Sequence, residues 1–89
     1  MKAIYKYEIK DTVCLPEGFQ ILDCQLQNGV PVFWALVNTD KDWPKECVKF
    51  RVMPTGAEFD KSYLDGWTYF KTIQDDLGFV WHWFMKEEE

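Results

Sequence analysis

The chain has 89 residues, a net charge of −5 and no run of basic residues, and these properties exclude several classes of protein. Its ten basic residues are scattered, whereas non-specific nucleic-acid binding depends on cationic patches, so we expect no such binding. The beginning, MKAIYKYEIK, lacks the apolar core of a signal peptide, and no run approaches the ~20 apolar residues that span a bilayer. We therefore expect one cytoplasmic domain over residues 1–89 with no membrane partner.

The three cysteines, Cys14, Cys24 and Cys47, are odd in number and widely spaced. This pattern is unlike a disulfide framework and favours buried thiols in a reducing compartment. No CxxC or HxxxH spacing accompanies the single histidine, His82, so a zinc site is not favoured. We expect no metal and no cofactor.

The first half of the chain alternates between apolar and polar residues in the manner of β-strands. Residues 3–9, AIYKYEI, have period two and are rich in aromatic and β-branched residues, which predicts a strand. Residues 12–15 are predicted to form a short strand or an extended arm, and Pro16 to Gly18 then break the chain. A third strand is predicted over 19–27.

The pair Asn28-Gly29 predicts a two-residue hairpin turn, because both residues accept the positive φ of a type I′ turn. One face of the predicted hairpin is wholly apolar and is the better candidate for the core. It pairs Leu26 with Pro31, Cys24 with Phe33 and Leu22 with Ala35. The other face pairs Gln27 with Val30, Gln25 with Val32, Asp23 with Trp34 and Ile21 with Leu36.

The second half contains three more predicted strands, at 47–53, 67–73 and 79–85, separated by polar loops. Only residues 57–66 have helical potential, for a short helix or a structured loop. Residues 86–89 are expected to be a frayed acidic tail. The pattern predicts a mainly β domain, an antiparallel meander that forms a small barrel or a two-layer sandwich, with at most one short helix.

Apolar residues occur on both faces of the hairpin and of the last strand, FVWHWFM. A domain of this size cannot form two cores, so the second face needs another cover. Aromatic residues make up 18% of the chain, and rings of this kind either fill a core or contact a partner. We therefore expect a homo-oligomer.

The order of these segments resembles a family of small bacteriophage and prophage proteins of unknown function. The resemblance rests on YKYEI, on the P-x-G-x-x-I-L-x-x-x-x-Q-N-G turn at 16–29, on WALV at 34–37 and on VWHWF at 80–84. The family's G-T-G-H box corresponds to 53–57, where MPTGA lacks the first glycine and the histidine. The resemblance implies a phage accessory protein in the cytoplasm of the host cell.

Six residues are candidates for binding. Gln25, Gln27 and Trp34 share the mixed face of the hairpin, where two amides and a ring suit a nucleobase or a protein interface equally well, and they equally suit packing within the domain. Thr55 and Gly56 offer a hydroxyl and a free amide to an anion. His82 lies between two tryptophans and is expected to hold a backbone carbonyl rather than to act as a base.

No nucleophile motif, P-loop or facing pair of carboxylates is present in the sequence, so we expect no enzyme. The expected function is that of a phage accessory protein that binds a host protein through an aromatic surface, with counter-defence as its purpose. A first alternative is an oligomer that sequesters a nucleotide-type signalling molecule. A second alternative is a minor structural protein of the virion.

Overall fold

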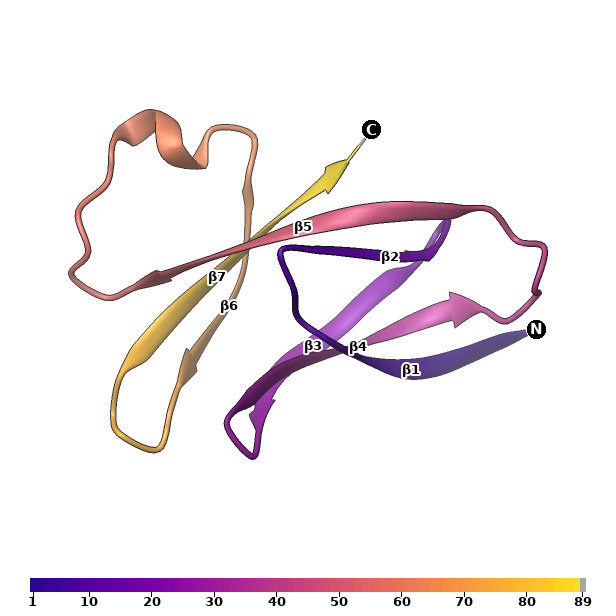
Figure 1. Ribbon diagram of the computed structural model, residues 1–89, viewed down its shortest axis with the longest axis horizontal. Coiled ribbons are helices and arrows are strands. Elements are labelled where there is room, and N and C mark those ends of the chain that lie inside the picture. The colour runs from indigo at the N-terminus through magenta and orange to yellow at the C-terminus, as the bar shows by residue number, and fades with distance from the viewer. Residues whose placement is uncertain (89) are drawn as a thin grey trace.

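The computed structural model describes residues 1–88, the side chain of Glu88 excepted, and consists of seven strands and one 3₁₀ turn (Figure 1). All seven strands lie where the sequence predicts them, with ends that differ by at most three residues. They are β1 (Lys2–Glu8), β2 (Thr12–Pro16), β3 (Gln20–Gln27), β4 (Val30–Asn38), β5 (Lys45–Pro54), β6 (Thr68–Gln74) and β7 (Val80–Glu88), with η1 (Lys61–Leu64) between β5 and β6.

The strands form two antiparallel sheets, one ordered β1-β4-β3 and the other β2-β5-β7-β6. The mainly β class is confirmed, and the two sheets correspond to the sandwich rather than to a closed barrel. Only β3–β4 and β6–β7 pair with a direct neighbour in sequence, so the connectivity is not that of a plain meander. Strands β1 and β2 pair with β4 and β5, which come later in the chain.

The β3–β4 hairpin has the predicted turn and most of the predicted register. Asn28 and Gly29 have φ values of 52° and 80°, and the pairing matches the prediction from Gln27↔Val30 back to Asp23↔Trp34. A bulge between Ile21 and Asp23 then shifts the register by one residue. The predicted pairings of Leu22 with Ala35 and of Ile21 with Leu36 are therefore wrong. Ile21 lies opposite Ala35, Gln20 lies opposite Leu36, and Leu22 is 45% exposed.

The hydrophobic core lies where the two sheets face each other, and a row of four rings crosses it. Phe33 of β4 is fully buried and stacks on Tyr7 of β1 at 5.3 Å between centroids. On its other side Phe33 contacts Phe50 of β5 at 5.1 Å, and Phe50 contacts Phe70 of β6 at 6.3 Å. The buried cluster comprises Ile9, Leu15, Cys24, Phe33, Ala35, Val37, Val48 and Phe50.

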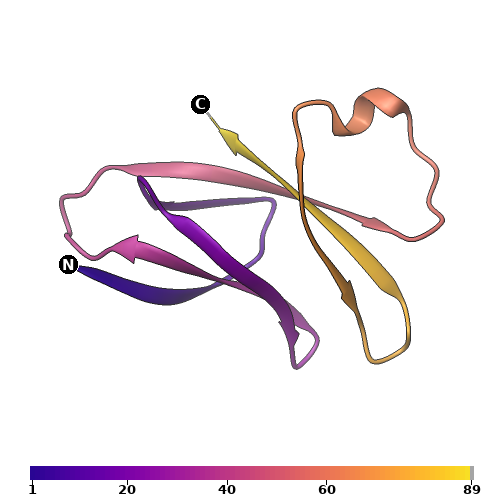
Figure 2. The same cartoon turned by 180° about the vertical axis from the view of Figure 1, so that it is seen from behind.

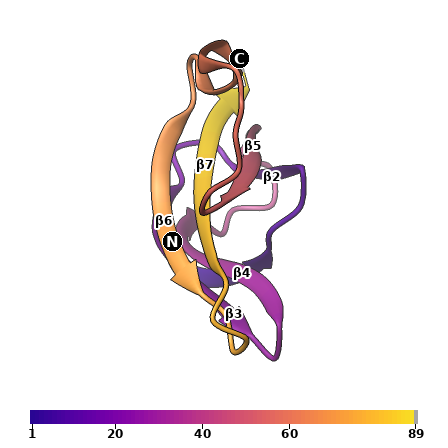
Figure 3. The ribbon, with the colours of Figure 1, turned by 90° about the vertical axis from the view of Figure 1, so that its left-hand side faces the viewer.

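The segment 51–87 contributes no fully buried residue, although it follows directly after the core strand segment that ends at Phe50. It includes η1 and the β6–β7 hairpin, which lie at one end of the molecule, while β1 lies at the other (Figures 1 and 2). Figure 3 shows β6 and β7 running side by side as one elongated ribbon. The fully buried residues therefore come from the first part of the chain, while Phe70, Ile73, Trp83 and Met85 of β6 and β7 are partly buried and pack against them.

Two local expectations for this segment have different outcomes. The helical potential at 57–66 appears as the single 3₁₀ turn of η1, capped by the Asp60 side chain, which accepts from the Ser62 amide. No helix within residues 1–88 has the length and apolar character needed to cross a bilayer. The expected fraying of 86–88 is wrong, because these residues continue β7 and pair with residues 47–49 of β5; Glu89 lies outside the described residues.

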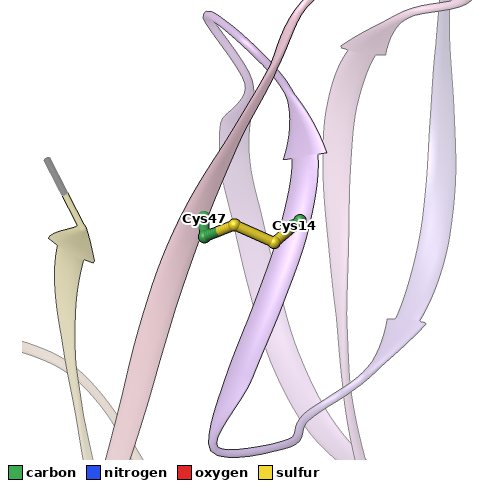
Figure 4. The surroundings of a disulfide bond; sticks show 2 residues. All are labelled: Cys14 and Cys47. Carbon is green, nitrogen blue, oxygen red and sulfur yellow. A yellow bond between two sulfur atoms is a disulfide. The ribbon is translucent and has the colours of Figure 1, made fainter.

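A disulfide joins Cys14 of β2 to Cys47 of β5 (Figure 4). The two residues lie directly opposite each other in the β2–β5 ladder, with Cα atoms 4.0 Å apart. The expectation of three buried thiols is therefore wrong for this pair, which strand pairing brings together from positions 33 residues apart. It is confirmed for Cys24, a free thiol in the core whose pKa burial raises to about 11.

One ion pair links the edges of the two sheets. Lys71 of β6 lies 2.7 Å from Asp23 of β3, and both side chains are about two-fifths exposed. The hydrogen bond from Lys71 holds the pKa of Asp23 below its usual value. A pair this exposed contributes little to stability because solvent screens it.

Candidate functional site

His82 lies on the outward face of β7, where a row of hydroxyl groups holds its ring. Thr55 Oγ1 lies 2.7 Å from Nε2, and Thr72 Oγ1 of β6 lies 3.0 Å from Nδ1. The hydroxyl of Tyr69 continues the row at 2.6 Å from Thr72 Oγ1. The expectation that His82 holds a backbone carbonyl is therefore wrong, because both ring nitrogens contact threonine side chains. Hydroxyl groups both donate and accept, so they suit either tautomer of the ring.

This row of hydroxyls connects three separate segments of the second sheet. Thr55 follows the end of β5, and its amide donates to the carbonyl of Val80 in β7. Gly56 completes the turn with a φ of 89°, a backbone conformation that glycine adopts readily. A Thr–His contact has the form of a nucleophile and its base. However, the group at Nδ1 is a hydroxyl rather than the carboxylate that stabilises a charged imidazole in hydrolase triads, and the arrangement is better suited to fixing the turn.

The hairpin candidates lie on the other sheet, so the structure does not join all six candidates in one site. Gln25 Nε2 donates to Asp23 of its own strand at 3.2 Å. Gln27 Oε1 accepts from Lys6 Nζ at 3.0 Å, a contact that spans β4 from β3 to β1. On β4, Lys6 lies opposite Trp34 and Gln27 lies opposite Val30. Val32 lies between these two β4 residues and is only 5% exposed. Both amides are therefore engaged within the protein, beside a half-buried Trp34.

A cleft that sequence reasoning did not predict lies beside the uncovered part of β5. Strand β2 pairs with β5 only as far as Lys49, and the Phe50 amide donates to the Asp11 carbonyl, so β5 has an open side from Arg51 onwards. The cavity there has a volume of about 600 Å³ and is lined in part by Lys10, Lys49, Arg51, Trp67 and Trp83. A second hollow of about 780 Å³ shares Lys49, Arg51 and Trp67 and adds Lys86. We call these two hollows the Arg51 cleft.

Arg51 is held between two rings at the centre of this cleft. Its guanidinium carbon lies 3.9 Å from the ring centroid of Tyr63 and 4.2 Å from that of Trp67. Its Nη1 also donates to the backbone carbonyl of Tyr63. These contacts attach residues 61–67, which we call the η1 segment, to β5, because cation–π contacts add about 0.5–2 kcal/mol each.

The charge of the cleft differs from that of the whole chain. Lys49 lies directly opposite Lys86 across the β5–β7 ladder, and Arg51 follows two residues later on the same face. The carboxylates that line the two hollows are those of Asp11 and Glu87. On a chain of net charge −5, this region is locally cationic. The Trp83 ring also lines it, and Trp83 Nε1 is a buried donor with no partner among residues 1–88.

The signal for this cleft was only partly visible in the sequence. The alternation in CVKFRVM places Lys49 and Arg51 on one face of a strand. Trp67 comes from the η1 segment and Lys86 from β7, and both line the second hollow with Lys49 and Arg51. Their proximity becomes visible only once the strands are paired. No local spacing relates these residues, so periodicity could not find them.

The aromatic residues of segment 51–87 form a second feature of this end of the molecule, which we call the aromatic arm. Ring contacts join Phe59 to Tyr63, Tyr69 to Phe84 and Phe79 to Trp81. Several of these side chains are about half exposed, with Phe79 at 58% and Tyr69 at 56%. The full set comprises Phe59, Tyr63, Trp67, Tyr69, Phe70, Phe79, Trp81, Trp83 and Phe84. Of these, Phe70 and Trp83 pack against the hydrophobic core.

Asp75 organises the tip of the arm. Its carboxylate accepts from Trp81 Nε1 at 3.0 Å and from the amides of Leu77 and Phe79 at 2.9 Å. The hydrogen bond from Trp81, followed by those from the turn amides, lowers the pKa of Asp75. This carboxylate therefore serves the turn, and it fixes the orientation of the Trp81 ring.

Comparison with known proteins places the chain in a family. No curated protein and no solved structure matches it. A family model described as a domain of unknown function, DUF7352, matches residues 1–89, which agrees with the expected resemblance to a family of unknown function. The chain therefore belongs to the DUF7352 family.

Proposed function

We propose that this protein is a non-catalytic binding protein that contacts another protein through the aromatic arm. The observation that carries this proposal is the contrast between the two parts of the chain. The fully buried residues all lie between Ile9 and Phe50, whereas the rings of 51–87 remain partly or largely exposed. Aromatic side chains, Trp and Tyr above all, are the residues that anchor protein interfaces.

The surface area of the chain supports a partner of ordinary size. A folded monomer of 10.7 kDa exposes about 5,500 Å², whereas this chain exposes 6309 Å². Its radius of gyration is 14.1 Å, against about 12 Å for a compact domain of this length. The excess of about 800 Å² equals one partner's share of a standard interface.

The finer part of the proposal concerns the partner. The resemblance to phage and prophage proteins supports a host protein as the target, and counter-defence as the purpose of binding. The acidic charge of the chain is compatible with a partner surface that is basic around an apolar centre. This part rests on analogy at the level of the family.

Matched surface variants test the role of the arm. Phe79→Ser removes a ring of the arm that is 58% exposed, and Leu22→Ser removes an apolar side chain of β3 that is 45% exposed. Host proteins captured by the wild type are purified, and the affinity of each for the wild type and for both variants is measured by calorimetry. We expect a loss of affinity of tenfold or more for Phe79→Ser. Equal affinity of both variants for each captured protein would contradict the proposal.

A second candidate function has its own supporting observation. The Arg51 cleft combines three cationic side chains with the Trp67 ring, and such a combination suits the phosphate and the base of a nucleotide. Binding here would correspond to sequestration of a nucleotide-type signal.

Thermal-shift measurements with linear and cyclic nucleotides test this candidate, with inorganic phosphate as the reference. Lys86→Gln removes a cation from the cleft, and Lys45→Gln removes an exposed one at the other end of β5. We expect a saturable shift for the wild type and for Lys45→Gln that is reduced for Lys86→Gln. The absence of a shift with every nucleotide, or a shift that phosphate reproduces in full, would exclude this function.

A further inference from the structure

Strand β1 is an open edge of the first sheet. It pairs with β4 on one side only, over seven residues and without a bulge. Natural proteins protect such edges with prolines, bulges, a covering segment or charged side chains, lysine above all. The sequence KAIYKYE contains no proline, and its charged residues are Lys2, Lys6 and Glu8. Ile4 is 59% exposed and Tyr5 is 49% exposed. The edge is thus long, regular and available.

The direction of the backbone groups of β1 follows from two hydrogen bonds at its ends. The Ile9 amide donates to the Pro31 carbonyl at 2.9 Å, and the Thr39 amide donates to the Met1 carbonyl at 3.0 Å. Residues 1 and 9 therefore turn their backbone groups towards β4. Because this direction alternates along an antiparallel strand, the odd-numbered residues bond to β4 and the even-numbered residues face the open edge. The outward groups belong to Lys2, Ile4, Lys6 and Glu8.

We propose that β1 pairs with β1 of a second copy of this chain, antiparallel and with the twofold axis at Tyr5. In this register the even-numbered residues form the hydrogen-bonded pairs, so all of their outward amides and carbonyls find partners. Tyr5 then lies opposite Tyr5 of the second copy at a position where the side chains approach most closely. The two sheets become one sheet of six strands with an isologous interface.

The charges of β1 select this register over its neighbours. Lys2 of each copy lies opposite Glu8 of the other, which gives two complementary pairs. A shift by two residues in one direction places Lys2 opposite Lys6, and a shift in the other direction places Lys6 opposite Lys6. Like charges directly opposite each other destabilise a strand pair. The sequence KAIYKYE is therefore complementary to itself only when it is centred on Tyr5.

The position of β1 leaves the aromatic arm free. β1 lies at the opposite end of the molecule from η1 and the β6–β7 hairpin (Figures 1 and 2). A dimer joined through β1 would present one arm at each end. The dimer does not depend on the proposed function, and a bivalent molecule of this kind would bind a multimeric partner more tightly than a monomer.

Charge-reversal variants test the interface, and analytical ultracentrifugation over a series of concentrations measures the fraction of dimer. We expect a dimer for the wild type and monomers for Lys2→Glu and for Glu8→Lys, because each change juxtaposes two like pairs. An equimolar mixture of the two variants should recover a dimer, since the two acidic positions of one variant then face the two basic positions of the other. The double variant should also recover it, because each introduced glutamate then faces an introduced lysine. A monomeric wild type, or single variants that dimerise as the wild type does, would overturn the proposal.

Backbone measurements provide an independent test. Ile4→Pro removes an outward amide and leaves the bonds to β4 in place, whereas Ile4→Ala retains that amide. We expect Ile4→Ala to dimerise and Ile4→Pro to remain monomeric. In the wild type, the amides of Lys2, Ile4, Lys6 and Glu8 should gain protection from hydrogen exchange as concentration rises. A dimer that forms without protection of these four amides would place the interface elsewhere and overturn the proposal.

Discussion

Removal of the Cys14–Cys47 disulfide should cause a large loss of stability. The perturbation is either reduction of the wild type or the double change Cys14→Ser and Cys47→Ser. The disulfide joins two strands that already pair in the folded chain, so its loss leaves the ladder in place. Its main effect is on the unfolded chain, in which the bond closes a loop.

The magnitude follows from the length of that loop. The two cysteines are 33 residues apart in sequence, and in the chain-entropy account a closed loop of this length is worth about 3.7 kcal/mol at 25 °C. A small domain is stable by only about 5–15 kcal/mol, so a large fraction of the total is at stake. For a domain of this size each kcal/mol shifts the melting temperature by about 4–8 °C, and we expect a fall of about 15–30 °C.

Urea denaturation followed by tryptophan fluorescence, with and without a phosphine reductant, measures this effect. The serine double variant is the control, because reductant should not change its midpoint. Thiol counting provides the second measurement: Cys24 is fully buried and its pKa is raised to about 11, so the native protein should not react and the unfolded protein should show one thiol. Three reactive thiols after unfolding without reductant, or a midpoint that reductant leaves unchanged, would refute the reasoning.

Three further predictions concern the core, the turn and the cleft. Phe33→Ala should destabilise the fold by about 3–5 kcal/mol, because Phe33 is 0% exposed between two other rings; a loss below about 1 kcal/mol in urea melts would contradict this role. The pKa of Asp75 is lower in the folded chain than its ordinary value, so its contribution to stability is present above pH of about 4 and is lost as the pH falls through the folded value. Asp75→Asn should therefore flatten the acid limb of a stability–pH curve, and an unaltered limb would show that the Trp81 contact is unimportant. Arg51→Lys should loosen the η1 segment, seen as faster hydrogen exchange at the Tyr63, Asp65 and Trp67 amides, since lysine cannot stack its charge between two rings as arginine does; unchanged exchange would contradict the attachment.

Local chemistry accounts for most of the secondary structure. The alternation in AIYKYEI and in CVKFRVM predicts strands that the structure contains, because side chains of a strand point to alternate faces. Asn28-Gly29 predicts a turn with positive φ at both residues, and both have it. Even the register of the hairpin follows from this turn as far as Asp23, since a two-residue loop determines which residues face each other.

Other features depend on contacts between distant segments, which no local pattern encodes. The bulge at Leu22 and the extension of β7 to Glu88 arise from pairing with particular partner strands. The Cys14–Cys47 bond has the same origin. Of the six candidate residues, pairing brings Thr55 next to His82 and leaves Gln25, Gln27 and Trp34 on the other sheet.

The sequence by itself determined the strands, the turns and an apolar surface larger than one small core, because all three follow from the type and spacing of neighbouring residues. Tertiary structure alone decided which strands pair, and thereby where that surface lies. It placed the fully buried residues before Arg51 and left the rings of 51–87 partly or largely exposed. It also assembled the Arg51 cleft from strands and a loop far apart in the chain. The physical reason is that strand pairing is a non-local choice, made by the total free energy of the fold rather than by any segment.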